Sequence, residues 1–320
     1  MKEHLLNILK GMGISPHIVK GFSEVPREEF LAKRCSLSLV YEDIVLVSYD
    51  DGEEFSTSSQ PSLMALFMEW VGIKEGMKVL EIGGGTGYNA AVMGKIVGKK
   101  GLVISVEYSS KICEFAQENL NRLGIENVVM KCGDGYVGAP EFSPFDAVVV
   151  TVGVDEIPHT WFEQLRERGM VVAPINLISS GRQPAFLFEK RKDYLVGHFK
   201  LDTRFIKASG MLGNLVERNR SKLKKNHSLE KVLPIPMVRA KNFLELIHLL
   251  TRRLTIIDGR FYYVGDEGFA CFEEDSMLVY GNLDELVALF QEWKGCGYRS
   301  FEELVLHVGY GTSSHIYCTT

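Results

Sequence analysis

The chain has no long apolar run, no paired-cysteine motif and no excess of positive charge. No stretch reaches membrane-spanning length, and the first ten residues are too polar and too few for a secretory signal. The formal net charge of −5 and the pI of about 6.0 argue against a nucleic-acid binder or a membrane-surface protein. We therefore expect a soluble, cytoplasmic protein.

The cysteines are few and scattered, and none has a cysteine or histidine partner at zinc-ligand spacing. They are Cys35, Cys113, Cys132, Cys271, Cys296 and Cys318. This pattern favours free thiols in a reducing compartment and no metal centre. The isolated His307 and His315 are interpreted as packing or surface groups.

From Lys78 onward the sequence alternates between apolar strands and helices. Strands are expected at 78–82, 102–107, 128–132, 145–151 and 170–174, with two more at 184–190 and 194–200. Helices are expected between them at 88–97, 109–124 and 159–168. Such alternation indicates an α/β fold with a doubly wound, mostly parallel sheet.

The two ends of the chain differ from this middle part. The N-terminal region predicts helices near residues 5–9, 16–22 and 26–31, a polar loop over 49–59, and a helix over 63–70. Residues 217–231 are strongly basic and are expected to form a solvated helix and linker. Beyond them we expect helices at 241–254 and 283–294, strands at 260–264, 269–273 and 277–280, and a terminal helix-like stretch from 301. The predicted organisation is therefore a domain over 1–209 and a small α+β domain over 210–320.

The most informative segment is a glycine turn that follows the first apolar strand. Residues 79–88 read Val-Leu-Glu-Ile-Gly-Gly-Gly-Thr-Gly-Tyr. Glycines let the backbone turn tightly and let a cofactor approach main-chain N–H groups. A dinucleotide GxGxxG match from Gly83 would need glycine where Tyr88 stands. The spacing is instead GxGxG, as in methyltransferases that use S-adenosylmethionine.

Three further features lie where an adenosine cofactor would need them. Glu107 ends the second strand, where an acid accepts hydrogen bonds from ribose hydroxyls. Asp134 and Gly135 follow the third strand and are suited to the adenine edge. Thr151-Val152-Gly153 follows the fourth strand and would border the methionine end. All of these lie at carboxyl ends of strands, where open α/β sheets bind ligands.

A loop rich in hydroxyl groups, Phe55 to Met64, precedes the sheet. Ser59 before Pro61 suits an ordinary helix start, and this local pattern does not by itself indicate function. The serines lack a GxSxG elbow, which argues against a nucleophilic hydrolase.

With this loop included, the chain resembles the protein-L-isoaspartate O-methyltransferases. The matching blocks are Val25 to Phe30, Tyr41 to Asp43, Thr57 to Pro61, 79–91, 133–135, 144–146, Gln164-Leu165 and Pro174. Two departures are Arg168-Gly169, where the family has Gly-Gly, and Lys207, where the family's Arg-Phe-Val-Pro segment has proline. The resemblance covers about residues 1–208.

The resemblance implies a repair enzyme that methylates the free α-carboxylate of L-isoaspartyl residues in damaged proteins and peptides. The ester then forms a succinimide that hydrolyses partly to aspartate. The cofactor is S-adenosylmethionine, and the product is S-adenosylhomocysteine. The implied catalytic residue is Ser59, which orients the reactants and is not a nucleophile. The positions expected to hold the cofactor are Glu81, Gly83, Gly85, Thr86, Gly87, Glu107, Tyr108, Asp134 and Gly135. Those expected to bind substrate are Thr57, Ser58, Gln60, Pro61, Arg204 and Phe205.

Other functions stay open at this point. A methyltransferase of the same fold that modifies an aspartate in a dedicated precursor peptide would explain the extra residues 210–320. A cofactor-binding or peptide-binding module without catalysis is another alternative. The sequence does not define the role of 210–320, the oligomeric state, the preferred flanking residues or the acceptance of D-aspartyl sites.

Overall fold

The computed structural model describes residues 1–310 and 313–318. The chain divides into two compact units. The first holds Met1–Val152, Thr160–Ala173 and Ala208–Gly210, and the second holds Gly153–His159, Pro174–Lys207 and Met211–Thr320. Each unit is described separately, and the predicted domain boundary near residue 210 stays a prediction.

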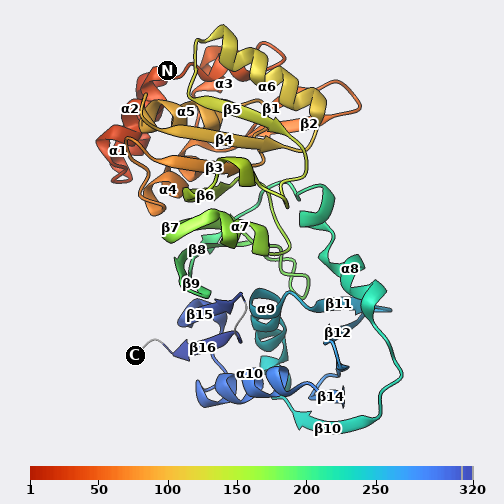
Figure 1. The fold of residues 1–320 in the computed structure, drawn as a ribbon. Helices are drawn as coiled ribbons and strands as arrows, with labels where there is room; N and C mark the ends of the chain where they lie inside the picture. The colour runs from red at the N-terminus through yellow and green to blue at the C-terminus, as the bar shows by residue number, and fades with distance from the viewer. Residues whose placement is uncertain (311–312, 319–320) are drawn as a thin grey trace. The chain divides into compact units, whose positions relative to one another are not determined.

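The first unit is built on parallel strands in the order β5-β4-β3-β6-β7 (Figure 1). The strands are β3 (Lys78–Ile82), β4 (Leu102–Glu107), β5 (Val128–Cys132), β6 (Phe145–Val150) and β7 (Leu165–Pro174). Their side chains are mostly buried, as in a sheet covered on both faces. Strand order reverses at β3, which is flanked by β4 and β6, and such a switch point opens a ligand crevice. The expected doubly wound parallel sheet is confirmed.

Helices accompany these strands, most of them at the expected places, although the one at Leu37–Val40 was not predicted. They are α1 (Lys2–Gly11), α2 (Pro16–Glu24), α3 (Leu37–Val40), α4 (Pro61–Trp70), α5 (Tyr88–Val97), α6 (Ser110–Arg122) and α7 (His159–Gln164). The expected third helix is a 3₁₀ turn, η1 (Arg27–Phe30). Figure 1 shows α1, α2 and α4 grouped together, in agreement with their mutual contacts. The prediction of a helix to residue 168 is wrong, because β7 begins at Leu165.

The expected polar loop over 49–59 is also wrong, since much of it forms a hairpin. Strand β1 (Leu46–Asp50) pairs antiparallel with β2 (Phe55–Ser58). The inward side chains include Ser48, Ser56 and Ser58. Because these buried positions hold polar residues, the strands show no alternation of apolar and polar residues in the sequence. The Asp51 carboxylate accepts from the N–H groups of Glu53 and Glu54 at 3.0 and 2.9 Å and stabilises the turn.

The second unit contains two antiparallel sets of strands. One has the order β8-β9-β15-β16, with β8 (Pro184–Arg191), β9 (Tyr194–Asp202), β15 (Leu304–Gly309) and β16 (His315–Cys318). The other has the order β10-β14-β13-β12-β11. Its strands are β10 (Leu229–Pro234), β11 (Leu254–Ile257), β12 (Arg260–Val264), β13 (Gly268–Phe272) and β14 (Ser276–Gly281).

Helices α8 (Leu215–Lys222), α9 (Ala240–Thr251) and α10 (Asp284–Gly295) complete this unit. The basic segment therefore begins with the expected helix, but it ends in β10, and β11 was not predicted. The helix-like stretch expected from 301 is wrong beyond the 3₁₀ turn η5 (Phe301–Glu303), and residues 311–312 and 319–320 lie outside the described part. Leu304, Leu306 and Val308 alternate inward, which is the period of a strand.

The expectation of free thiols is wrong for four of the six cysteines. Disulfides join Cys113 to Cys132 and Cys296 to Cys318, while Cys35 and Cys271 stay free. Each pair is about twenty residues apart in sequence, and its partners come from different elements, so spacing alone did not reveal them. In the chain-entropy account, a loop of this length gives roughly 3 kcal/mol of stabilisation.

A thiol count tests this connectivity. The unfolded, unreduced protein should show two reactive thiols, and reduction should raise the number to six. The assay is titration with a thiol reagent in denaturant, with Cys35→Ala as the control that removes one thiol without touching a disulfide. A count of six before reduction would contradict the structure.

Candidate active site

The glycine turn after β3 is tightly enclosed by neighbouring strand ends. The N–H groups of Gly83 and Gly84 donate to the Val106 carbonyl on β4 at 2.9 and 3.1 Å. Gly83 has φ +92°, and a Cβ there would lie 2.6 Å from a methyl carbon of Val152. Only glycine combines that backbone angle with so little space. The turn therefore keeps a fixed shape in front of the α5 N-terminus.

Glu107, at the end of β4, binds this turn directly. Its Oε2 accepts from the Gly85 N–H at 2.8 Å, and its Oε1 accepts from the Ser109 N–H at 3.1 Å. Burial raises the pKa of Glu107, while the backbone donors oppose the shift. The carboxylate is thus held at the edge of the turn, where the sequence predicts a ribose contact.

Glu81 has a different position from the other predicted cofactor residues. Its side chain is fully buried, and it accepts from Asn89 Nδ2 at 2.7 Å and from the Ser105 hydroxyl. Burial raises its pKa to about 7, although both hydrogen bonds oppose the shift. Glu81 therefore orients Asn89 from behind the turn, and it is not one of the residues that line the hollow described next.

The hydroxyl-rich loop and the glycine turn face one hollow of about 330 Å³, part of which is open solvent. Its lining is Thr57, Ser58, Ser59, Met64, Gly83, Gly84, Gly85, Thr86, Tyr88, Asn89 and Thr151. The predicted catalytic serine and the first part of the predicted cofactor turn thus share one space. Two buried polar atoms on its wall, the Tyr88 hydroxyl and Asn89 Oδ1, have no partner among the described residues. Such atoms are suited to a polar ligand.

Gln60 and Pro61 lie beside this hollow at the start of α4. Asp43 holds that helix start, since its Oδ1 accepts from the Ser62 N–H and its Oδ2 from Gln60 Nε2, both at 2.8 Å. The Gln60 side chain therefore binds Asp43 and helps to hold the start of α4.

The segment that carries Ser59 is held by a buried arginine that sequence reasoning did not single out. Arg27 is fully buried on η1 and donates to the carbonyls of both Ser58 and Ser59 at 3.1 Å. It also donates to the Ser58 hydroxyl at 3.1 Å and to the carbonyls of residues 40, 42 and 44. Its guanidinium lies 5.8 Å from the Tyr88 ring centre. Burial lowers the pKa of Arg27, but a guanidinium still carries its charge.

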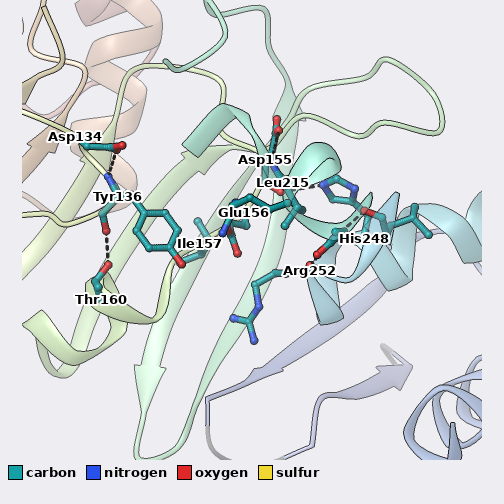
Figure 2. A network of polar contacts seen from close by, with 12 residues as sticks. Asp134, Tyr136, Asp155, Glu156, Ile157, Thr160, Leu215, His248 and Arg252 are labelled. Atoms are coloured by element: carbon teal, nitrogen blue, oxygen red, sulfur yellow. Dashed lines mark hydrogen bonds and ion pairs between the residues drawn. The ribbon is translucent and has the colours of Figure 1, made fainter. Parts of the chain in front are cut away.

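The remaining predicted cofactor residues surround Gly210. A Cβ at Gly210 would lie 2.4 Å from Asp134 Oδ2 and 2.7 Å from Tyr108 Cε2. Asp134 Oδ1 accepts from the Tyr136 N–H at 2.9 Å, and Thr160 donates to the Tyr136 carbonyl, as Figure 2 shows. The Gly135 carbonyl accepts from the buried Trp161 ring at 2.8 Å. These contacts fix the loop after β5. Gly87, another predicted cofactor residue, is the N-cap of α5 and has a left-handed backbone conformation.

Arg204 and Phe205, the predicted substrate-binding residues of the later segment, belong to the second unit. The Gln183 side chain holds their segment, because Oε1 accepts from the Phe205 N–H at 2.5 Å and Nε2 donates to the Phe205 carbonyl at 3.2 Å. The Thr203 hydroxyl donates to the Gln183 carbonyl at 2.7 Å.

Sequence reasoning also missed Met64, Tyr88 and Asn89 as lining residues. Tyr88 and Asn89 directly follow the glycine turn, and this position could have indicated that they line the site. Arg27 and Asp43 stand in two of the blocks that match the family, but their contacts reach residues 13 to 32 positions away, so the sequence did not show what they bind.

Two negative findings hold for residues 1–310 and 313–318. No helix there combines the length and the apolar character that crossing a bilayer requires. No three His, Cys, Asp or Glu side chains gather in an arrangement that could hold a metal ion.

Comparison with known proteins agrees with the fold and the motifs. A family model described as protein-L-isoaspartate(D-aspartate) O-methyltransferase matches residues 1–213, and a model of the C-terminal domain of protein-L-isoaspartyl O-methyltransferase matches 214–320. The chain is 64% identical over 319 residues, covering 100% of both chains, to a protein-L-isoaspartate O-methyltransferase of Thermotoga maritima. It is 38% identical over 183 residues to protein-L-isoaspartate O-methyltransferase 1 of Archaeoglobus fulgidus, covering 57% of this chain and 80% of that one.

Solved structures give the same result. A protein-L-isoaspartate O-methyltransferase matches with a TM-score of 0.97 and 63% identity over 100% of both chains. A Plasmodium falciparum protein, titled as a complex with S-adenosyl-L-homocysteine, supports the fold alone, with a TM-score of 0.55 and 23% identity over 64% of this chain and 97% of that one. The chain belongs to the protein-L-isoaspartate(D-aspartate) O-methyltransferase family.

Proposed function

We propose that this protein transfers a methyl group from S-adenosylmethionine to the free α-carboxylate of L-isoaspartyl residues in damaged proteins and peptides. The observation that carries the proposal is the shared hollow, in which Ser59 and the glycine turn face each other in a chain of this family. S-adenosylhomocysteine is the second product, and the methyl ester initiates repair through a succinimide.

The residues around the hollow fit S-adenosylmethionine. Asn89 Oδ1 has no partner among the described residues and is suited to the positively charged amino group of the methionine end. Its orientation is fixed by Glu81, to which Asn89 Nδ2 donates at 2.7 Å. Glu107 is suited to the ribose hydroxyls, and Asp134 with Gly135 is suited to the adenine. The bound cofactor supplies an electrophilic methyl group on a sulfonium centre.

The protein's own part in the reaction is to orient the carboxylate. A carboxylate is ionised near neutral pH and needs no general base before it attacks a methyl group. Alignment of oxygen, carbon and sulfur then supplies much of the rate, and effective molarity can contribute roughly 7–11 kcal/mol. The Ser59 and Tyr88 hydroxyls are donors that can hold the carboxylate, and burial raises the pKa of Tyr88 so that it keeps its proton.

The finer assignments rest on the same proposal. We assign residues 1–209 to catalysis and 210–320 to an accessory domain, supported by family models that divide the chain at 213 and 214. We also place the enzyme in the cytoplasm, where its substrates would be aged proteins. The two disulfides are unusual for a reducing compartment, so the thiol count bears on this assignment too.

A matched pair of synthetic peptides tests the function, one with an isoaspartyl residue and one with aspartyl at the same position. Labelled methyl groups should enter only the isoaspartyl peptide and should be released by mild base, as expected of an ester. Cofactor binding without transfer to either peptide would contradict the proposal. Transfer to a dedicated precursor peptide alone would favour the tailoring enzyme that the sequence left open.

Ser59→Ala tests the role of the serine. Loss of one orienting donor should lower kcat about 10- to 100-fold, while the Kd for S-adenosylhomocysteine changes less than about twofold. Steady-state kinetics and calorimetry measure the two quantities. Ser23→Ala is the control, because that hydroxyl only donates to the Lys20 carbonyl within α2. Equal losses in kcat and in cofactor affinity would rule out the assignment.

Arg27→Lys tests whether the buried guanidinium positions the Ser59 segment. One ammonium group cannot replace a planar fork that reaches several carbonyls, so kcat/KM should fall at least about tenfold. The thermal midpoint should also fall, because buried carbonyls lose their donors. Arg34→Lys, at an exposed arginine, is the matched control. Wild-type kinetics in Arg27→Lys would show that the segment is held without this residue.

A further inference from the structure

A second buried charge, Asp155, lies in the loop three residues after Val152. Its side chain is only 1% exposed. Oδ1 accepts from Asn176 Nδ2 at 2.9 Å. Oδ2 lies 3.3 Å from Lys207 Nζ and accepts from the Leu215 N–H at 3.4 Å. A buried carboxylate persists when it is paired and hydrogen-bonded, and both conditions are met here.

The backbone of Asp155 is bound as fully as its side chain. Its N–H donates to the Leu212 carbonyl at 2.8 Å, and its carbonyl accepts from His248 Nε2 at 2.9 Å. Figure 2 shows Asp155 next to Leu215 and His248. Since a carbonyl only accepts, Nε2 carries the proton, and burial lowers the pKa of His248, which favours the neutral ring. We call Asp155, Asn176, Lys207, Leu215 and His248 the Asp155 cluster.

This cluster joins two chain segments that the sequence assigns to ligands. They are the loop after β6, expected beside the methionine end, and the Arg204–Phe205 segment, expected to bind substrate. The Gly153 N–H donates to the Ile206 carbonyl at 2.8 Å, and Gly153 forms a parallel bridge with Lys207. The loop after β6 and the segment of Arg204 and Phe205 are therefore bound side by side. Lys207 and Asp155 add an ion pair across the same junction.

The two halves of the sequence contribute differently to the cluster. Asp155, Asn176 and Lys207 fall in the stretch matched by the methyltransferase family model, whereas Leu215 and His248 fall in the stretch matched by the C-terminal domain model. The accessory domain thus contributes a backbone donor and an imidazole donor to one acidic residue. These donors fix Asp155, and Asp155 in turn pairs with Lys207, two residues after Phe205.

We propose that Asp155 and Lys207 are positioning residues for the peptide substrate, and that the accessory domain acts on peptide binding by holding Asp155 through Leu215 and His248. This inference deepens the proposed function and rests on it for its kinetic readout. It gives residues 210–320 a defined task, which is to order the segment that is expected to line the peptide groove.

Lys207→Met tests the proposal at a side chain that is 56% exposed. Because the change leaves the buried Asp155 carboxylate without its ion pair, the thermal midpoint is measured beside the kinetics to show that the variant is folded. The KM for the isoaspartyl peptide should rise about tenfold, while kcat and the Kd for S-adenosylhomocysteine change less than about twofold. Lys207→Arg should restore most of the lost affinity. Arg220→Met removes a comparably exposed cation that pairs with Glu217 on α8 and donates to the Ile256 carbonyl at 2.8 Å. Neither partner belongs to the Asp155 cluster, so this change should leave all three quantities unchanged.

A double-mutant cycle with Asp155→Asn shows whether the two residues act through each other. Once the Asp155 charge is absent, Lys207→Met should raise KM by less than about twofold, so the effects should be clearly non-additive. Additive effects, or a KM equal to that of wild type in Lys207→Met, would overturn the proposal. A loss of cofactor affinity equal to the loss of peptide affinity would overturn it as well.

Hydrogen exchange gives a readout that does not depend on activity. Deuterium uptake in peptides that cover 152–157 and 203–207 should rise in Lys207→Met and stay at the wild-type level in Arg220→Met. If the wild-type protein methylates neither test peptide, the proposed function fails, and this comparison still decides whether the cluster holds the two segments together. Unchanged uptake would overturn the cluster's role even in an active enzyme.

Discussion

The close approach of residues on β2, on β4 and just after β6 to the glycine turn is the constraint on which the candidate site depends. A Cβ at Gly83 would meet Val152 after β6, at Gly84 it would lie 2.3 Å from the Ser105 hydroxyl on β4, and at Gly85 it would lie 3.0 Å from the Ser56 hydroxyl on β2. The turn is thus the place where the hairpin and two parallel strands meet. Because no side chain separates them, the loop of Ser59 and the backbone of the turn come close enough to line one small hollow.

Buried polar contacts then fix the orientation of each part of that hollow. Arg27 binds the carbonyls of Ser58 and Ser59, whereas Glu81 binds Asn89 from behind the turn. Neither side chain needs to touch a ligand to affect catalysis, since a small displacement of reacting groups lowers the rate strongly. The strongly shifted pKa of Glu81 follows from this arrangement, because a carboxylate placed under a glycine turn is removed from water.

The sequence predicted those parts of the fold in which apolar residues recur with the period of a strand or a helix. The parallel strands over 78–150 and their helices were predicted within a few residues, as was the glycine turn. The β1–β2 hairpin was missed because serines occupy its buried positions, and the terminal strands were missed because a short alternation was taken for a helix. Disulfides and the partners of Arg27 depend on which distant segments meet, and no local pattern records that.

Two buried charges of opposite sign, one in each unit, hold distant chain segments together. Arg27 is surrounded by carbonyl oxygens, and Asp155 by N–H groups and an ammonium group, so each is satisfied mainly by atoms from distant parts of the chain. Apolar side chains would bury comparable surface, but they would tolerate small shifts between the segments they join. Hydrogen bonds to a buried charge tolerate little, because a displaced partner leaves the charge unsatisfied at a cost of several kcal/mol. That stiffness suits segments that must present a carboxylate to a methyl group in a narrow range of geometries.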